Sequence, residues 1–303
     1  KIAVIKQLDH ASLDEIANAV TAELDQISAD KNVKIEYEVT SGQGDQTILK
    51  QLSDQAIADG VDAIIPIATT AAQIAALSAE ETKTPVVYAA ISDPETAKLT
   101  GIDYVTGTSD ALNTEFIMDM MFAVQPDIQT VGLLYSNSEA NSTTPIAEAK
   151  AYLDAKGIAY VEKTGNTNDE IMTAANALVG QVDAVFTPTD NTVMTAELAI
   201  YEKFLNAKIP QYCGADSFAL NGAFVGYGVD YTALGKMTAD MVVQVLVDGK
   251  SPSTLPVATF DNGIAMINTD SCTALGYDLA AVKQAFDGKC SSVLETTTQQ
   301  NFD

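Results

Sequence analysis

Three segments of the chain recur in the same order further along it, and this internal repeat constrains the fold more than any other feature of the sequence. The matched pairs are AVIKQLDHAS at 3–12 with GLLYSNSEAN at 132–141, GVDAIIPIATTAA at 60–72 with QVDAVFTPTDNTV at 181–193, and TPVVYAAIS at 84–92 with IPQYCGADS at 209–217. Their offsets of 129, 121 and 125 residues are nearly constant. Chance similarity of one strand does not produce three matches in order, so we expect two similar lobes in tandem.

Short β-branched runs alternate with longer helical patterns in both halves. Strand–helix–strand alternation predicts an α/β fold, in which parallel sheets are covered by helices on both faces. The spacing of apolar residues predicts helices over 47–59, 168–179 and 230–248, and a glycine follows the first and the third. The run at 257–269 predicts a strand that returns after the last of these helices.

The charge of the chain excludes two classes of partner. It has 41 acidic and 16 basic residues, for a net charge of −25. No basic stripe is available to displace counterions from phosphates, so no nucleic-acid partner is expected, and a polybasic membrane patch is excluded for the same reason. The strong negative charge is typical of a soluble monomer.

All 16 basic residues are lysines. Without arginine, no guanidinium fork can hold a carboxylate or phosphate of a ligand. An anionic group must instead be held by helix N-termini, hydroxyls and backbone N–H groups.

Cysteine usage and hydropathy set further limits. No apolar run approaches about 18 residues, so no membrane-spanning helix is predicted. Cys213, Cys272 and Cys290 have no metal-ligand spacing, and we expect neither a metal nor a cofactor. Cys213 is expected to be a buried, inert residue of a strand. Cys272 and Cys290 could form a disulfide in an oxidising compartment.

Polar residues gather where the predicted strands end, which is where parallel sheets bind ligands. The candidates in the first half are His10, Thr69, Thr70 and Ser92; those in the second half are Ser136, Asn137, Asn141, Ser142, Thr189, Asp190, Asn191 and Asp216. Helix capping prefers the same residue types, and both interpretations stay open for each loop. Asp190 and Asp216 could neutralise an ammonium group, while hydroxyls and helix ends take a carboxylate. Tyr227 could line the same cleft and stack on a planar ligand, although core packing explains it as well.

Two features resemble enzyme motifs, but neither predicts an enzyme. His10 is the only histidine, and no nucleophile motif accompanies it, so acid–base catalysis is not expected. SGQGDQT at 41–47 lacks the third glycine of a dinucleotide fingerprint, since Thr47 stands there; a tight turn between a strand and a helix explains it.

Several stretches together resemble the substrate-binding proteins of ABC importers, in particular the branch associated with tryptophan and other aromatic amino acids. They are QGD after the second strand, GVDAIIPIATTAAQ, GTSD, LLYSNSEANS, VDAVFTPTDNTV and GYGVDYTALGKM. The resemblance implies the type I periplasmic-binding-protein fold, with two Rossmann-like lobes joined by a three-strand hinge. It places lobe one at 1–110 plus about 229–255 and lobe two at 111–228 plus about 256–303.

The resemblance also implies the function. It assigns Thr69 and Thr70 to one side of the ligand, and Asn141, Ser142, Thr189, Asp190, Asn191 and Asp216 to the other. Typical members have a proline where this chain has Thr70. The implied protein is a non-enzymatic receptor that closes around an aromatic amino acid and delivers it to a membrane permease. It would be periplasmic or lipid-anchored at the cell surface. A branched-chain amino acid, a nucleoside or a sugar remains the alternative ligand.

Overall fold

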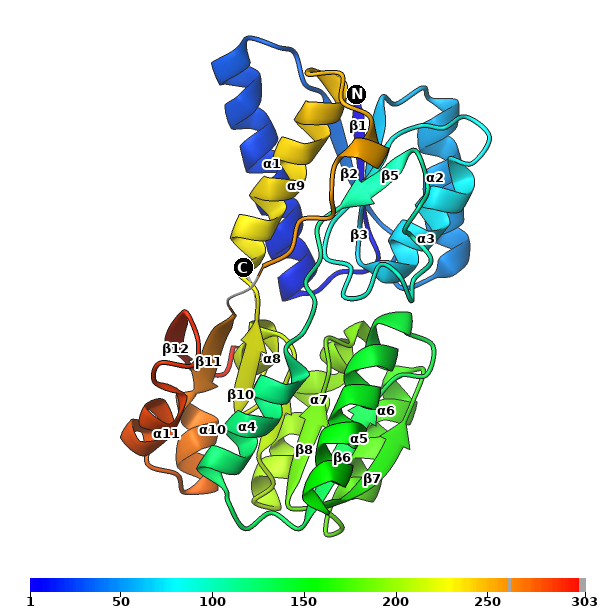
Figure 1. Cartoon of the computed structure of the whole chain (residues 1–303). Coiled ribbons are helices and arrows are strands. Elements are labelled where there is room, and N and C mark those ends of the chain that lie inside the picture. Colours follow the sequence, from blue (N-terminus) through cyan, green and yellow to red (C-terminus); the bar gives the residue numbers. More distant parts are fainter. Residues whose placement is uncertain (261–262, 300–303) are drawn as a thin grey trace. The chain divides into compact units, whose positions relative to one another are not determined.

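A computed structural model describes residues 1–260 and 263–299 of the chain (Figure 1). The chain divides into two compact units, each with its own sheet and core. Unit 1 comprises Lys1–Ala111 and Asp230–Phe260, and unit 2 comprises Leu112–Val229 and Asp261–Asp303. The chain therefore passes between the units three times.

The third boundary differs from the expected position near 255. Ala258 pairs with Thr108 of unit 1 in an isolated parallel bridge. Its N–H donates to the carbonyl of Gly107 (3.0 Å), and its own carbonyl accepts from the N–H of Ser109 (2.8 Å). These bonds hold the segment before residue 260 in unit 1. The single strand predicted over 257–269 is therefore wrong in its first part, and a regular strand begins only at Ile264.

Unit 1 is a five-stranded parallel sheet with helices packed against it. Its elements are β1 (Ile2–Lys6), α1 (Ala11–Lys31), β2 (Tyr37–Ser41), α2 (Gln46–Ala58), β3 (Ala63–Ile67), α3 (Thr69–Ser78), β4 (Val86–Tyr88), β5 (Val105–Gly107) and α9 (Tyr231–Leu246). The strand order is β2-β1-β3-β4-β5. Every residue of β3 is buried, as expected of a central parallel strand covered on both faces.

The two helices predicted in unit 1 begin and end within two residues of their expected positions. The carboxylate of Asp45 accepts from the N–H groups of Thr47 and Ile48, which caps α2 and explains SGQGDQT as a tight turn. The helix α9, which returns from far along the chain, lies beside α1 (Figure 1). Gly235 allows this close approach, because a Cβ there would lie 2.7 Å from the Cβ of Ala19 and 2.8 Å from the carbonyl oxygen of Ile16.

Unit 2 contains a larger, seven-stranded sheet. Its elements are α4 (Thr114–Val124), β6 (Thr130–Tyr135), the 3₁₀ turn Ala140–Ser142, α5 (Thr143–Lys156), β7 (Ala159–Thr164), α6 (Asn168–Leu178), β8 (Ala184–Thr187), α7 (Asn191–Asn206), β9 (Gln211–Cys213), α8 (Asp216–Leu220), β10 (Val225–Gly228), β11 (Ile264–Asn268), α10 (Thr269–Leu275), α11 (Leu279–Phe286) and β12 (Ser292–Thr296). The strand order is β12-β11-β10-β9-β8-β6-β7.

The two sheets share the topology that the internal repeat predicts. The order β7-β6-β8-β9-β10 in unit 2 reproduces β2-β1-β3-β4-β5 in unit 1. The matched segments fall on β1 and β6, on β3 and β8, and on β4 and β9. Two Rossmann-like α/β units are thus confirmed.

One pair of strands departs from the parallel arrangement. β11 runs antiparallel to β10, and Gly228 pairs with Ile264. Gly228 is the last residue of β10 and Ile264 the first residue of β11, so the chain leaves and re-enters unit 2 at the same end of the sheet. The returning strand must therefore run in the opposite direction.

All three cysteines are free thiols. Cys213 is buried in β9, as expected. The thiol of Cys272 donates to the carbonyl of Tyr277 at 3.6 Å, and that of Cys290 to the carbonyl of Phe286 at 3.7 Å. The disulfide considered from the sequence is not formed in this structure.

Candidate ligand-binding site

The predicted site residues fall into two groups, one in each unit. With the exception of Tyr227, all of them lie just after the carboxyl end of a strand, in a loop or in the first residues of a helix. In unit 1 they follow β1, β3 and β4; in unit 2 they follow β6, β8 and β9. Because the carboxyl ends of parallel strands share one edge, each unit presents its candidates along a single edge of its sheet.

In unit 1 the start of α3 is shaped by strained backbone. Ala68, the residue before the helix, has φ 77° and ψ 163°, a conformation that residues with a side chain rarely adopt. Thr69 and Thr70 follow as the first two residues of α3. The N–H of Thr70 donates to Oε1 of Gln7 at 3.0 Å, which ties this loop to the end of β1. A proline at position 70 could not make that bond, so the departure from the family pattern has a structural consequence.

Ser92 points into unit 1. Its hydroxyl donates to Oδ1 of Asp110 at 2.9 Å, and the hydroxyl of Tyr231 donates to Oδ2 at 3.2 Å. Burial raises the pKa of Asp110, and these two hydrogen bonds oppose the shift. Ser92 therefore holds a buried carboxyl, which is a structural role that the sequence did not indicate.

In unit 2 one carboxylate organises the loops after β6 and β8. Oε2 of Glu139 accepts from Nδ2 of Asn141 (3.1 Å), from the N–H of Asn191 (3.1 Å) and from Nδ2 of Asn191 (2.7 Å). Oε1 accepts from the N–H and the hydroxyl of Thr192, at 2.8 and 2.9 Å. Glu139 thus caps α7 from a neighbouring loop and fixes both asparagine side chains.

Asp190 makes the second connection between these loops. Its Oδ2 accepts from the N–H of Ser136 and from the hydroxyl of Ser142, both at 2.7 Å, and its Oδ1 accepts from the N–H of Val193 at 2.9 Å. The residue is 1% exposed. Burial and the charge of Glu139 raise the pKa of Asp190 to about 7. With three hydrogen bonds made, Asp190 connects the loops; its pairing with a ligand ammonium stays a prediction.

The remaining candidates of this edge, Ser136, Asn137 and Thr189, each donate a hydrogen bond to a neighbouring loop or strand. The hydroxyl of Ser136 donates to Oδ1 of Asn166 (3.0 Å). Asn137 is exposed and donates to the hydroxyl of Thr164 (3.1 Å), at the end of β7. The hydroxyl of Thr189 donates to the carbonyl of Gly214 at 2.9 Å.

The loops after β8 and β9 touch closely. A Cβ at Gly214 would lie 2.7 Å from the backbone nitrogen of Thr189, so only glycine fits there. Asp216 begins α8 directly after this loop and is partly exposed. Among the acidic site candidates of unit 2, it is therefore the one that a solvent-borne group can reach.

Tyr227 does not belong to the edge formed by the loops. It lies within β10, 6% exposed, in the hydrophobic core of unit 2. Its ring packs on Phe116 with centroids 4.9 Å apart, and its hydroxyl bonds to the backbone of Gly263. Core packing, the alternative left open by the sequence, is the better interpretation. His10 precedes α1, and its side chain makes no capping hydrogen bond to that helix.

Comparison with known proteins identifies the family. The family model described as ABC transporter substrate binding protein matches residues 1–281. The chain belongs to this family of ABC substrate-binding proteins.

Solved and curated relatives of this substrate-binding protein cover most of the chain. A Streptococcus pneumoniae ABC domain in complex with L-Trp is 30% identical, with a TM-score of 0.87 over 97% of this chain and 100% of that one. A conserved domain protein from Vibrio cholerae is 26% identical, with a TM-score of 0.86 over 96% and 98%. The curated tyrosine-binding protein of Clostridioides difficile is 28% identical over 90% of this chain and 80% of its own length. The fold is that of the type I periplasmic binding proteins.

Two features are absent from the described residues. No helix among them is both long and apolar enough to cross a membrane. Across residues 1–260 and 263–299, no group of three or more His, Cys, Asp or Glu side chains has an arrangement that suits a metal ion.

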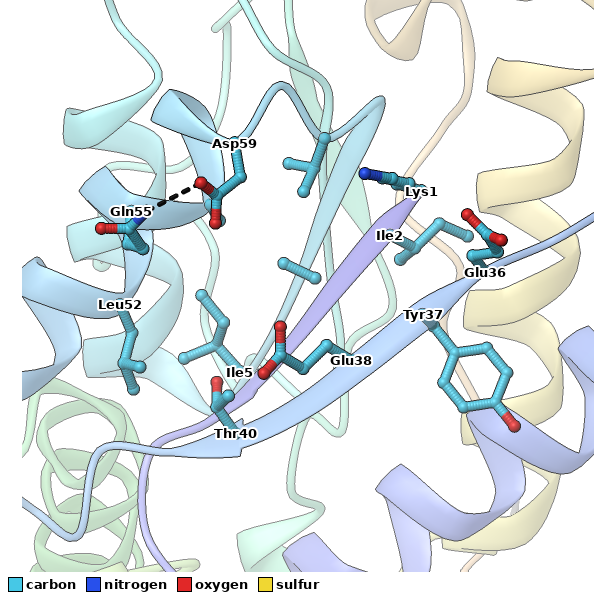
Figure 2. Close-up of a pocket in the computed structure, with 13 residues that line it drawn as sticks. Lys1, Ile2, Ile5, Glu36, Tyr37, Glu38, Thr40, Leu52, Gln55 and Asp59 are labelled. Atoms are coloured by element: carbon cyan, nitrogen blue, oxygen red, sulfur yellow. Dashed lines mark hydrogen bonds between the residues drawn. The ribbon is translucent and has the colours of Figure 1, made fainter.

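A hollow of about 440 Å³ lies elsewhere in unit 1 of the substrate-binding protein, between α2 and the face of β1 and β2 (Figure 2). Its walls carry Glu38 on the strand side and Asp59 on the helix side, over apolar side chains such as Ile5 and Leu52. No predicted site residue lines it, and Glu38 and Asp59 are exposed. Exposed carboxylates form only weak ion pairs with a charged group. The strand-end loops therefore stay the predicted ligand site.

Sequence reasoning missed two residues of these loops, Glu139 and Gln7. Glu139 stands within SNSEANS, the stretch from which Asn141 and Ser142 were chosen. Acidic residues are mostly solvated, so nothing in the pattern distinguished a buried carboxylate. Gln7 ends up 5% exposed beside the start of α3.

Proposed function

We propose that the chain is the receptor of an ABC importer for an aromatic amino acid. The observation that supports this most directly is the opposite chemistry of the two edges. Unit 2 presents buried and partly exposed carboxylates, whereas the start of α3 in unit 1 offers hydroxyls and backbone N–H groups. An amino acid carries one ammonium and one carboxylate, which suit an acidic and a helix-terminal environment respectively.

The assignment of roles follows from this contrast. Thr69 and Thr70, with the N-terminus of α3, bind the ligand carboxylate, for which the chain has no arginine. Asn141 and Asn191, both held by Glu139, bind at the ammonium end. Binding by both lobes with hinged closure belongs to this proposal. The relatives named for tyrosine and solved with L-Trp favour an aromatic side chain.

Family membership also supports the setting. Substrate-binding proteins of ABC importers work outside the cytoplasm and pass their ligand to a membrane permease, and we propose the same for this chain. A lipid anchor that holds the protein at the membrane stays a prediction.

Titration calorimetry with tryptophan, tyrosine and phenylalanine tests the function. We expect at least one to bind with Kd well below about 100 μM, and leucine, a nucleoside and a hexose to bind more weakly. Because the chain has no tryptophan, the fluorescence of bound tryptophan reports binding independently. If none of the three aromatic amino acids binds more tightly than about 100 μM, the proposal is wrong.

A further inference from the structure

The side chain of Asn141 contains a buried acceptor without a donor. The residue is 5% exposed. Its Nδ2 donates to Oε2 of Glu139 and to the carbonyl oxygen of Thr189. Its Oδ1 is buried and has no hydrogen-bond partner among the described residues. Native proteins leave few buried polar atoms unpaired, so this one calls for an explanation.

The orientation of this amide follows from its neighbours. Turning it over would place its oxygen against the Glu139 carboxylate and the Thr189 carbonyl, two acceptors that would repel it. Glu139 therefore fixes which end of the amide is the oxygen, and the structure provides no donor for that oxygen.

The surroundings of Asn141 are negatively charged. The five donors on Glu139 and the three on Asp190 are backbone N–H, amide and hydroxyl groups, all of them neutral. No salt bridge within residues 1–260 and 263–299 involves either carboxyl. Buried charges usually have a partner of opposite charge. A cation with N–H groups would satisfy both the orphan oxygen and the charge.

We propose that Oδ1 of Asn141 accepts a hydrogen bond from the ligand ammonium group, and that Glu139 is the positioning residue that orients this amide and supplies the negative charge. The inference rests on the proposed function and adds to it where the ammonium lies. Asp216, the sequence-based candidate, then takes no primary part in ammonium recognition.

The carboxyl of Asp190 gives this site a proton linkage. Burial and Glu139 raise its pKa to about 7 in the free protein. The groups that face it are Glu139, the N–H groups of Ser136 and Val193, and the hydroxyl of Ser142. Ser142, whose hydroxyl donates to Asp190, follows Asn141 in the chain, so a cation held by Asn141 favours the ionised form of Asp190 and lowers its pKa. Binding near pH 7 therefore releases a proton, and affinity rises with pH toward 7 and levels off above it.

A double-mutant cycle between protein and ligand tests the proposal. The ligands are L-tyrosine and L-tryptophan, each paired with its analogue without the amino group, 3-(4-hydroxyphenyl)propionate or indole-3-propionate. The proteins are wild type, Glu139→Gln, Asp216→Asn and the control Glu170→Gln. Glu170 also accepts a backbone N–H, from Asn166 at 2.7 Å, at the start of α6, but it is exposed.

For wild type we expect the amino acid to bind about tenfold or more tightly than its analogue. In Glu139→Gln this ratio should fall to within about threefold, whereas Glu170→Gln and Asp216→Asn should keep it. If Asp216→Asn abolishes the preference and Glu139→Gln retains it, the inference is overturned.

A second measurement needs no variant, in case Glu139→Gln does not fold. Calorimetry of wild type at pH 7 in phosphate and in Tris reports the protons released on binding. We expect a substantial fraction of one proton per ligand, and an affinity that increases between pH 6 and 7. Binding that is tight but independent of pH, with no proton released, would contradict the inference and leave the proposed function standing. Wild type that binds no aromatic amino acid would overturn both.

Discussion

The two units repeat one topology, yet their strand-end loops are held together differently. In unit 1 the loops after β1 and β3 are joined by the neutral amide of Gln7, which accepts from Thr70. In unit 2 the loops after β6 and β8 are joined by the carboxylates of Glu139 and Asp190, which together accept eight hydrogen bonds. Duplication of the fold thus repeats the edge at which the polar loops lie, while a few side chains decide which charged groups these loops contain.

The largest expected effect is a loss of stability at Asp190. The matched position is Thr69, which occupies the same place in the repeat. Asp190→Ala leaves three buried donors without an acceptor and should lower the free energy of unfolding by about 2–4 kcal/mol. Thr69→Ala removes a hydroxyl from the first residue of α3 and should cost less than about 1 kcal/mol. Urea unfolding followed by circular dichroism measures both.

A conservative variant makes this comparison sharper. Asp190→Asn retains one acceptor oxygen, so its loss of stability should fall between those of the two alanine variants. Equal losses for Asp190→Ala and Thr69→Ala would show that the carboxylate does not connect the loops of unit 2.

The second prediction concerns one buried carboxyl in each unit. Glu197 in α7 is fully buried; Nε2 of Gln211 donates to its Oε2 at 3.0 Å, and burial raises its pKa to about 8. A carboxyl whose pKa is raised on folding binds its proton more tightly in the native state. The contribution of Glu197 to the free energy of unfolding is therefore complete below the unfolded pKa near 4.5. It decreases as the pH rises toward 8. Glu197→Gln should remove this decrease, so that at pH 9 it is more stable than wild type by on the order of 2 kcal/mol.

In unit 1 the buried carboxyl is Asp110, and Asp110→Asn should change stability in the same direction but by less, because Ser92 and Tyr231 stabilise its ionised form. Thermal unfolding at pH 5 and pH 9 compares the variants. The exposed Glu202, also on α7, provides the control Glu202→Gln, which should match wild type at both values. A Glu197→Gln protein with an unchanged pH profile would contradict the assignment.

The sequence predicted the fold well because its signals were redundant. The repeat, the β-branched runs and the helical spacing of apolar residues each indicate the same arrangement of strands and helices. Lobe one was expected to end near 255, whereas unit 1 extends to Phe260, because the segment around Ala258 makes single backbone bonds to Gly107 and Ser109. Isolated backbone bonds of this kind leave no periodic pattern of side chains to recognise.

The sequence predicted that the candidate residues follow strand ends, and all but Tyr227 do; that they bind the ligand stays a prediction. Strand ends carry polar residues both as caps and as ligand contacts, and the residue types do not separate the two. Ser92 and Asp190 turned out to bond within their own units. Glu139 was missed because its burial depends on contact between the loop after β6 and the loop after β8. The sequence around Glu139 shows only the first of these loops. Asn141 was chosen from its place after a predicted strand and from the family resemblance, and neither indicated the orientation of its amide.

The smallest expected effect is a difference in stability between variants of two buried tyrosines, one in each unit. The sequence did not distinguish these two residues. The hydroxyl of Tyr88 in β4 is buried without a partner among the described residues, whereas that of Tyr227 bonds to the backbone of Gly263. Tyr88→Phe removes an unsatisfied group and should leave stability unchanged or raise it by up to about 1 kcal/mol. Tyr227→Phe should lower it by about 1 kcal/mol. Neither ring lies in a strand-end loop, so both variants should bind the aromatic amino acid as wild type does. A clear loss of affinity in Tyr227→Phe, measured by calorimetry, would return Tyr227 to the ligand site and make the β10 strand part of it.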